Sequence, residues 1–229
     1  TAGVTTYDAN DLFAFELGYN VTTLSGAAAQ FNGNISEKKW KGPFAEIAAG
    51  YTYAYDKLNR LLSSASSDKI SGSWAVNNKY DEKSITYDKN GNIKTLARYD
   101  NSTVLDNLTY TYTGNQLIKV EDAGNATLSF KNAVNTATEY LYDANGSMNK
   151  DDNKGIGNIV YNYLNLPQTI TVTGKGTINY TYDATGNKLK KVTFDQVANT
   201  TKTTWYAGAF VYEENALQLI QQDEGRVRV

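Results

Sequence analysis

The sequence contains no cysteine and no histidine, only one methionine and only two prolines in 229 residues. Without cysteine and histidine the chain cannot form a Ser-His-Asp or Cys-His catalytic site, and it lacks the usual ligands of zinc, copper and haem. The absence of disulfides says little about its compartment. We therefore expect no enzyme activity, no cofactor and no bound metal.

Two further absences bear on the partners of the protein. No apolar run approaches the ~20 residues that a membrane-spanning helix needs, so we expect no insertion into a membrane. The net charge is −2 and the lysines and arginines are scattered along the chain, whereas binding of nucleic acid requires a clustered basic face. No signal peptide is recognisable and the chain begins with Thr1, which we interpret as a mature or excised piece of a longer protein.

Tyrosine, by contrast, is abundant, with 18 residues, and many asparagines and threonines accompany it. Tyrosine and threonine favour half-buried strands, whereas asparagine and glycine favour tight turns. A Tyr-Asp pair followed by turn residues occurs five times, at Tyr7, Tyr55, Tyr87, Tyr142 and Tyr182. Recurrence of one pattern every ~20–50 residues indicates a repeat architecture.

The segments around these pairs alternate apolar and polar residues, as half-buried strands do. Residues 51–55 alternate, residues 56–59 carry turn signals and residues 60–62 start a return strand. The predicted fold class is all-β, with consecutive antiparallel β-hairpins forming a curved, twisted repeat sheet. The best candidate for a helix, residues 215–222, is short.

The recurring turn residues have a physical reason. An aspartate at the first position of a type I turn accepts hydrogen bonds from backbone N–H groups of the turn, and a glycine at the fourth position allows the left-handed conformation that precedes a bulged return strand. Asparagine tolerates that conformation better than most residues. The predicted turn-forming residues are Asp56, Asn59, Asp88, Gly91, Asp143, Gly146, Asp183 and Gly186.

Tyrosines spaced two residues apart lie on one face of a strand, so successive hairpins are expected to stack their rings into an aromatic ladder. The predicted ladder consists of Tyr53, Tyr55, Tyr87, Tyr110, Tyr112, Tyr142, Tyr161, Tyr163, Tyr180 and Tyr182. Three tryptophans, Trp40, Trp74 and Trp205, are candidate contacts for a carbohydrate ligand. The competing interpretation is that each tryptophan packs on the sheet.

Two weaker alternatives concern carboxylates. Oxygen-bearing residues alternate from Asp143 to Asp151, as in a calcium loop, but Met148 stands where an EF-hand has glycine and Lys154 where it has glutamate. A pair of glutamates could serve a glycosidase, although sequence cannot set the required separation. We expect the glutamates considered for that role to be solvated strand and turn residues; they are Glu139, Glu213, Glu214 and Glu224.

The pattern is looser before residue 50 than after it. We assign residues 1–50 to degenerate N-terminal repeats and residues 51–229 to the clear repeat region. No linker rich in proline or serine and no block of charge separates them, so we expect one continuous repeat domain. Its open sheet edges could pair with a second copy of the chain.

The segment Tyr51–Leu61, which reads YTYAYDKLNRL, and the segment Tyr142–Gly146, which reads YDANG, resemble the YD repeats of the RHS (rearrangement hotspot) family. Similar repeats occur in bacterial polymorphic-toxin proteins, in the B and C components of Tc toxins and in the teneurins. Residues 155–167 resemble stretches of Bacteroidetes-type members, and residues 222–228 resemble the segment that leads into the RHS-associated core domain.

The resemblance implies a structural role. Family members build a β-sheet strip that spirals into a shell, and the shell encloses a C-terminal toxin domain or forms an extracellular barrel. This chain is too short to close a shell and stops before the core-associated region. The implied function is a non-catalytic wall segment of a secreted or surface-exposed bacterial protein, with the remainder of the parent protein and its toxin domain as partners. The alternative is an adhesion module that binds glycans or other cell-surface proteins through exposed tyrosines and tryptophans.

Overall fold

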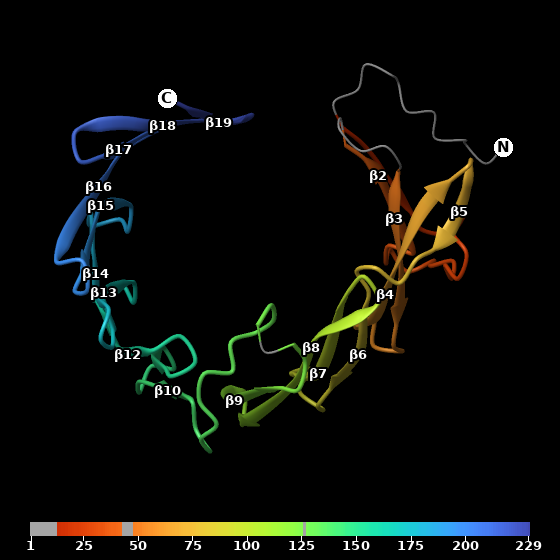
Figure 1. Ribbon diagram of the computed structural model, residues 1–229, viewed down its shortest axis with the longest axis horizontal. Helices are drawn as coiled ribbons and strands as arrows, with labels where there is room; N and C mark the ends of the chain where they lie inside the picture. Colours follow the sequence, from red (N-terminus) through yellow and green to blue (C-terminus); the bar gives the residue numbers. More distant parts are fainter. Residues whose placement is uncertain (1–12, 43–47, 126) are drawn as a thin grey trace. The chain divides into compact units, whose positions relative to one another are not determined.

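The computed structural model describes residues 13–42, 48–125 and 127–229. In these residues the backbone forms nineteen β-strands and no helix, so the predicted all-β fold class is confirmed. Every strand pairing is antiparallel and nearly all join strands that are consecutive along the chain (Figure 1). No helix in the described part of the chain is long and apolar enough to cross a membrane.

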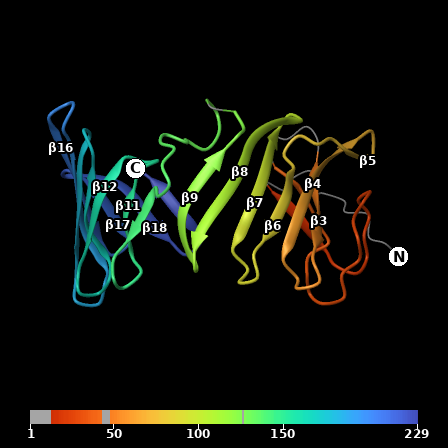
Figure 2. The same ribbon diagram turned by 90° about the horizontal axis from the view of Figure 1, so that it is seen from below.

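The chain divides into two compact units, each of which is built on one sheet. Unit 1 comprises Thr1–Thr111 and Val120–Lys131. Its strands follow one another across the sheet, as Figure 2 shows from β3 to β9, and β5 pairs only with β4. They are β1 (Ala14–Gly18), β2 (Glu37–Lys41), β3 (Ala49–Tyr55), β4 (Leu61–Ile70), β5 (Ser73–Val76), β6 (Glu82–Tyr87), β7 (Ile93–Asp100), β8 (Thr103–Thr113) and β9 (Gln116–Asp122).

Unit 2 comprises Tyr112–Lys119, the tip of the β8–β9 hairpin, and Asn132–Val229. Its ten-stranded sheet runs from β10 to β19 in chain order. The strands are β10 (Tyr140–Tyr142), β11 (Met148–Asp151), β12 (Ile156–Tyr161), β13 (Pro167–Val172), β14 (Gly176–Tyr182), β15 (Lys188–Asp195), β16 (Thr200–Ala207), β17 (Phe210–Glu213), β18 (Ala216–Gln222) and β19 (Gly225–Arg228). The best helix candidate in the sequence, residues 215–222, is not helical: β18 occupies nearly all of it and pairs with both neighbouring strands.

The two sheets are single layers, so few side chains are fully buried. In unit 1 the connection between β1 and β2 folds onto one face of the sheet and places Leu24, which is 4% exposed, against Gly50. The other buried apolar residues are distributed along the strands; they are Ala48, Ile85, Ala97, Leu108 and Val120 in unit 1, and Tyr140, Ile159 and Val211 in unit 2. The predicted single repeat domain and its boundary at residue 50 stay a prediction.

Candidate functional site: the Tyr-Asp turns

Four of the five Tyr-Asp pairs that are followed by turn residues lie in described residues, and all four make the same turn; the pair Tyr7-Asp8 lies outside the described residues. In each turn the aspartate Oδ1 accepts hydrogen bonds from the N–H groups two and four residues later, at 2.8 or 2.9 Å. The aspartate N–H donates to the carbonyl four residues on, which closes the hairpin. The carboxylate therefore organises the whole turn. The four aspartates are Asp56, Asp88, Asp143 and Asp183.

A residue with positive φ follows three positions after each aspartate. The φ angles are +64° at Asn59, +90° at Gly91, +84° at Gly146 and +90° at Gly186. The strand pairing shifts register at the tyrosine that precedes each aspartate, so every hairpin carries a bulge at the same place. A bulge increases the local twist of a strand, and its repetition twists the sheet regularly.

A fifth turn of this kind begins at Asn162. The alternation of residues 159–163 predicts a hairpin here with its turn around residues 164–167, and the structure begins the turn two residues earlier. Asn162 Oδ1 accepts hydrogen bonds from the N–H groups of Leu164 and Leu166, and Asn165 has a φ of +58°. The register again shifts at the preceding tyrosine, Tyr161. This turn does not match the Tyr-Asp pattern because Asn162 replaces the aspartate and Asn165 replaces the glycine, although the two residues have the same spacing.

The tyrosine before each turn connects its hairpin to the previous one. Its hydroxyl donates a hydrogen bond of 2.6 to 3.0 Å to a backbone carbonyl within two residues of the start of the neighbouring strand. Burial raises the pKa of these phenols, so they stay protonated donors. The five pairs are Tyr55 with Ile35, Tyr87 with Leu61, Tyr142 with Leu117, Tyr161 with Met148, and Tyr182 with Pro167.

Further contacts join neighbouring turns directly. In unit 1 the Arg60 guanidinium pairs with Asp56 at 2.7 Å, donates to the carbonyl of Asp88 and lies 4.5 Å from the centroid of the Tyr87 ring. In unit 2 the Ser147 hydroxyl donates to Asn165 Oδ1 at 2.9 Å. The turn edge of each sheet is thus cross-linked in addition to the hydrogen bonds between its strands.

The predicted ladder tyrosines are half-buried, with one exception. Ring contacts join tyrosines two residues apart on one strand, such as Tyr51 with Tyr53 and Tyr180 with Tyr182, each pair with centroids 6.2 Å apart. The assignment of Tyr163 to the ladder is wrong: β12 ends at Tyr161, and Tyr163 lies in the Asn162 turn with 84% of its surface exposed. Tyr53, Tyr110 and Tyr112 lie within β3 and β8 as expected.

Each tryptophan lies near a lysine. Trp40 stacks on Tyr51 with centroids 5.4 Å apart, and Lys38 lies over its ring. Trp74 has Lys69 at 6.0 Å from its centroid. Trp205 is 44% exposed, with Lys190 at 4.9 Å. No arrangement here singles out a carbohydrate site, and glycan binding stays a prediction.

A second set of structural residues, the buried carboxylates, was not predicted from the sequence. Five acidic side chains are at most 1% exposed: Glu37, Asp81, Asp106, Glu139 and Asp151. Most of them hold the backbone of a neighbouring segment. Glu37 accepts hydrogen bonds from the N–H groups of Thr23 and Leu24 and pairs with the buried Lys39 at 3.2 Å, and Asp81 accepts the N–H and hydroxyl of Ser66.

The expectation that Glu139 is solvated is wrong. Its side chain is fully buried and accepts a hydrogen bond of 2.7 Å from the Asn153 amide. Glu213, by contrast, is partly exposed and pairs with Lys202 at 2.5 Å. Among the described residues no group of three or more His, Cys, Asp or Glu side chains is placed to hold a metal. In the calcium-loop candidate, Asp143 organises its own turn while Asp151 accepts the N–H of Lys154.

The hydrogen bonds that Asp56, Asp88 and Asp183 accept in their turns lower the pKa values of these three carboxyl groups. In Asp183 the amide of Asn187 and the hydroxyl of Thr185 are the main cause, and the pKa falls to about 2. The pKa of Asp88 is lowered chiefly by the Asn92 amide, and that of Asp56 chiefly by the Arg60 N–H. Burial raises the pKa of Glu37 and Asp81, but the hydrogen bonds they accept outweigh it, so their pKa values also lie below the ordinary range.

These shifts predict how stability depends on pH. A carboxyl whose pKa is lower in the folded than in the unfolded chain stabilises the fold above its unfolded value of about 4, and this contribution is lost as the pH falls through the folded pKa. We expect the melting temperature, followed by circular dichroism, to be level from pH 8 to about 5 and to fall steeply between about 4 and 2. Because the chain has no histidine, a step between pH 6 and 8 would contradict this prediction.

The turn geometry predicts the effect of a substitution at Gly146. A β-branched residue resists a φ of +84°, so Gly146→Val should lower the free energy of unfolding by about 1–3 kcal/mol. Urea unfolding followed by circular dichroism measures this value. The matched control is Gly146→Asn at the same position, because asparagine tolerates this conformation better than most residues and should therefore cost much less than valine. Wild-type stability of Gly146→Val would refute the turn assignment.

No protein-family model matches the sequence, and no curated protein matches it either. Among solved structures, the crystal structure of TcdB2-TccC3-TEV aligns with 94% of this chain at a TM-score of 0.54 and 16% sequence identity. The Tc holotoxin pore of Photorhabdus luminescens aligns with 88% of this chain at 12% identity, but with a TM-score of only 0.28. The chain spans 12% of the first of these structures and 15% of the second. It shares the fold of a segment of TcdB2-TccC3, which supports the resemblance to Tc toxin components that its sequence indicates.

Proposed function

We propose that this chain is a non-catalytic structural segment of an RHS-type protein and forms part of a wall around a C-terminal toxin domain. The observation that supports this most is the repetition of one connecting device. Five hairpins end in the same turn, and a tyrosine hydroxyl ties each of them to its neighbour.

A wall needs continuous sheet rather than a pocket. Each hairpin here adds two strands to a hydrogen-bonded ladder, and the tyrosine bond fixes the turn edge without a second layer of structure. Repeat arrays gain stability from such contacts between neighbours. Because the chain spans only 12% of TcdB2-TccC3-TEV, enclosure requires the remainder of the parent protein. That parent is proposed to be secreted or exposed on a bacterial surface.

Limited proteolysis of the full-length parent protein tests this function. We expect its C-terminal domain to resist protease in the intact protein and to become sensitive when the hairpin of residues 178–192 is deleted. As a matched control, conservative substitution at the exposed Tyr163 should leave the protection unchanged. Equal cleavage rates with and without the hairpin, or a parent protein that has no further domain, would refute the proposal.

A further inference from the structure

Cationic side chains gather on one face of the unit 2 sheet. The register places Tyr180, Lys191 and Thr204 side by side on adjacent strands, and Tyr206 beside Val211 on the same face. Lys188 also belongs here, because its ammonium lies 4.6 Å from the Tyr180 centroid and 5.6 Å from that of Tyr206. We call this surface the basic face, and its cationic residues are Lys175, Lys188, Lys191, Lys202, Arg226 and Arg228.

The opposite face has a different composition. Alternate residues of the same strands point there, and many of them are threonines or asparagines, such as Asn179, Thr181 and Thr203. Lys190 and Trp205, which are register partners on β15 and β16, also lie on this second face. The cations of β15 to β19 are thus concentrated on one side of a sheet that water can reach from both sides.

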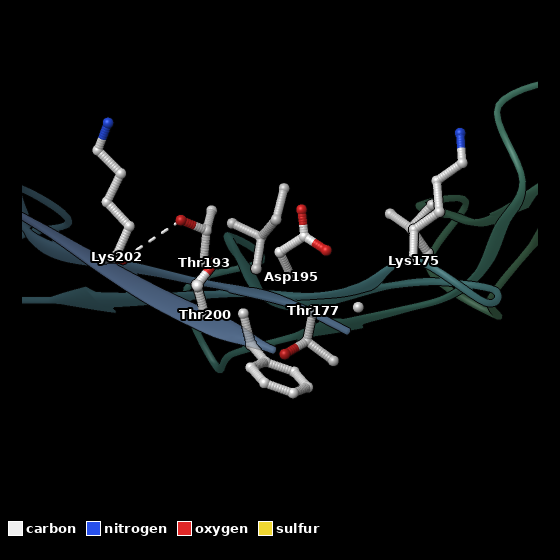
Figure 3. A pocket seen from close by; sticks show the side chains of 10 residues that line it. Lys175, Thr177, Thr193, Asp195, Thr200 and Lys202 are labelled. Carbon is white, nitrogen blue, oxygen red and sulfur yellow. Dashed lines mark hydrogen bonds between the residues drawn. The ribbon is translucent and has the colours of Figure 1, made fainter. Parts of the chain in front are cut away.

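The basic face is hollowed in two places. A depression of about 380 Å³ lies over β13 to β16, with Val172 and Ile178 among its lining residues. Figure 3 shows the side chains of Lys175 and Lys202 rising at opposite ends of it, with Thr193 and Asp195 between them and Thr177 on the other side of the sheet. A second depression of about 560 Å³ lies over β15 to β19. Its lining residues include Lys191, Tyr206, Val211, Leu219, Arg226 and Arg228.

Few carboxylates offset this charge. Asp195 and Glu213 are the acidic residues that line the two depressions, against six cations on the same face. Glu213 pairs with Lys202 at 2.5 Å, and Asp195 Oδ1 accepts the N–H groups of Val197 and Ala198 in its own turn. The basic face is therefore net positive, although the whole chain carries a net charge of −2. Complementary charge steers and selects binding partners.

We propose that the basic face binds an extended acidic segment of polypeptide, with carboxylates that meet Lys191, Arg226 and Arg228 and apolar side chains that enter the two depressions. This inference rests on the proposed function and deepens it by naming the face of the wall that contacts the enclosed chain and the chemistry of that contact. Alternate residues of an extended peptide point the same way, which suits the mixture of cations and apolar residues along these strands.

The structure favours a polypeptide over a single-stranded nucleic acid. Proteins that bind single-stranded nucleic acids combine a basic groove with open aromatic rings on which the bases stack. On the basic face the Lys188 ammonium lies over the rings of both Tyr180 and Tyr206, so these rings are not open platforms. The depressions are lined instead by aliphatic side chains such as Val172, Ile178 and Leu219.

Fluorescence anisotropy with the 229-residue chain tests the inference. The probe is a labelled peptide of alternating glutamate and leucine; alternating lysine–leucine peptide and oligothymidine serve as comparison probes. We expect the glutamate–leucine peptide to bind most tightly, and the double variant Lys191→Gln/Arg226→Gln to weaken it about tenfold or more. The control is Lys190→Gln, which removes one positive charge at the residue next to Lys191 but on the opposite face, and which should leave the affinity unchanged.

Three results would overturn the inference: tighter binding of oligothymidine, equal weakening by Lys190→Gln, or no binding of any probe. Circular dichroism of the same samples separates this failure from failure of the proposed function. If the chain gives a β-sheet spectrum but binds no peptide, the proposed acidic partner is refuted and the proposed wall function is unaffected. Absence of the β-sheet spectrum in the wild-type chain would count against the wall role itself.

Discussion

Replacement of Gly176 by alanine is expected to lower the free energy of unfolding by about 3 kcal/mol or more. Gly176 is buried at the start of β14, where it pairs with Val172 on one side and Asp195 on the other. Its φ is +136°, and a Cβ atom placed there would collide with the backbone carbonyl oxygen of Phe194. Backbone atoms of a paired strand cannot move aside as a flexible side chain can, so either β14 or β15 must shift.

The neighbouring Gly174 provides the control. It also has a positive φ, +69°, but a Cβ atom there meets nothing within 4 Å. Gly174→Ala therefore carries only the conformational cost, about 1 kcal/mol. Urea unfolding of both variants, followed by tyrosine fluorescence and circular dichroism, compares the two costs. If the two substitutions were equally costly, the close approach of β14 and β15 at Gly176 would be refuted.

The hairpin fold could be predicted from sequence because its signals are local. Alternation of apolar and polar residues gives the strands, and an aspartate with a glycine three residues later gives the turn. Both signals lie within a dozen residues of each other. The Asn162 turn was predicted two residues too late because the prediction followed residue types. The structure depends on two properties that asparagine shares with aspartate and glycine: an acceptor oxygen at the first position and tolerance of positive φ at the fourth. Reading residues 162–165 by spacing would also have placed Tyr163 in the turn.

The links between hairpins were harder to predict. The alternation of tyrosines indicated a shared face, but whether a ring stacks or its hydroxyl donates depends on the carbonyl that the next strand presents. That carbonyl lies 13 to 26 residues away in the chain, as for Tyr161 and Met148 or Tyr87 and Leu61. Sequence spacing alone does not give this distance in space.

The burial of the carboxylates could not be predicted from the sequence for a different reason. An isolated acidic residue near a strand end is usually solvated, and nothing near Asp106 in the sequence distinguishes it from an exposed residue. Its partner Phe130 is 24 residues away. Burial of such a group is tolerated only because its acceptor positions are filled, and the donors are assembled only when the connecting segment folds back onto the sheet.

Replacement of Asp106 by asparagine should therefore destabilise unit 1 by about 3 kcal/mol. Asp106 lies in β8 with 0% of its surface exposed. One carboxylate oxygen accepts the N–H of Phe130 at 2.7 Å, and the other meets both Nε and Nη2 of Arg98 at 2.6 Å. An amide is uncharged and offers one acceptor oxygen, so either Phe130 or Arg98 would face an NH₂ group. The segment after β9 would lose its anchor on the sheet.

Asp100→Asn is the matched control, because it makes the same chemical change at the end of β7. The Asp100 side chain is only half-buried, and its Oδ1 accepts a hydrogen bond from the side-chain amide of the adjacent Asn101. We expect this variant to change stability by less than about 0.5 kcal/mol. Hydrogen exchange measured by mass spectrometry adds a local readout: in Asp106→Asn, residues 127–131 should exchange faster than in the wild type while the strands β3 and β4 keep their protection. Unchanged exchange in residues 127–131 would mean that the buried carboxylate does not hold this segment, and the anchoring role assigned to Asp106 would fail.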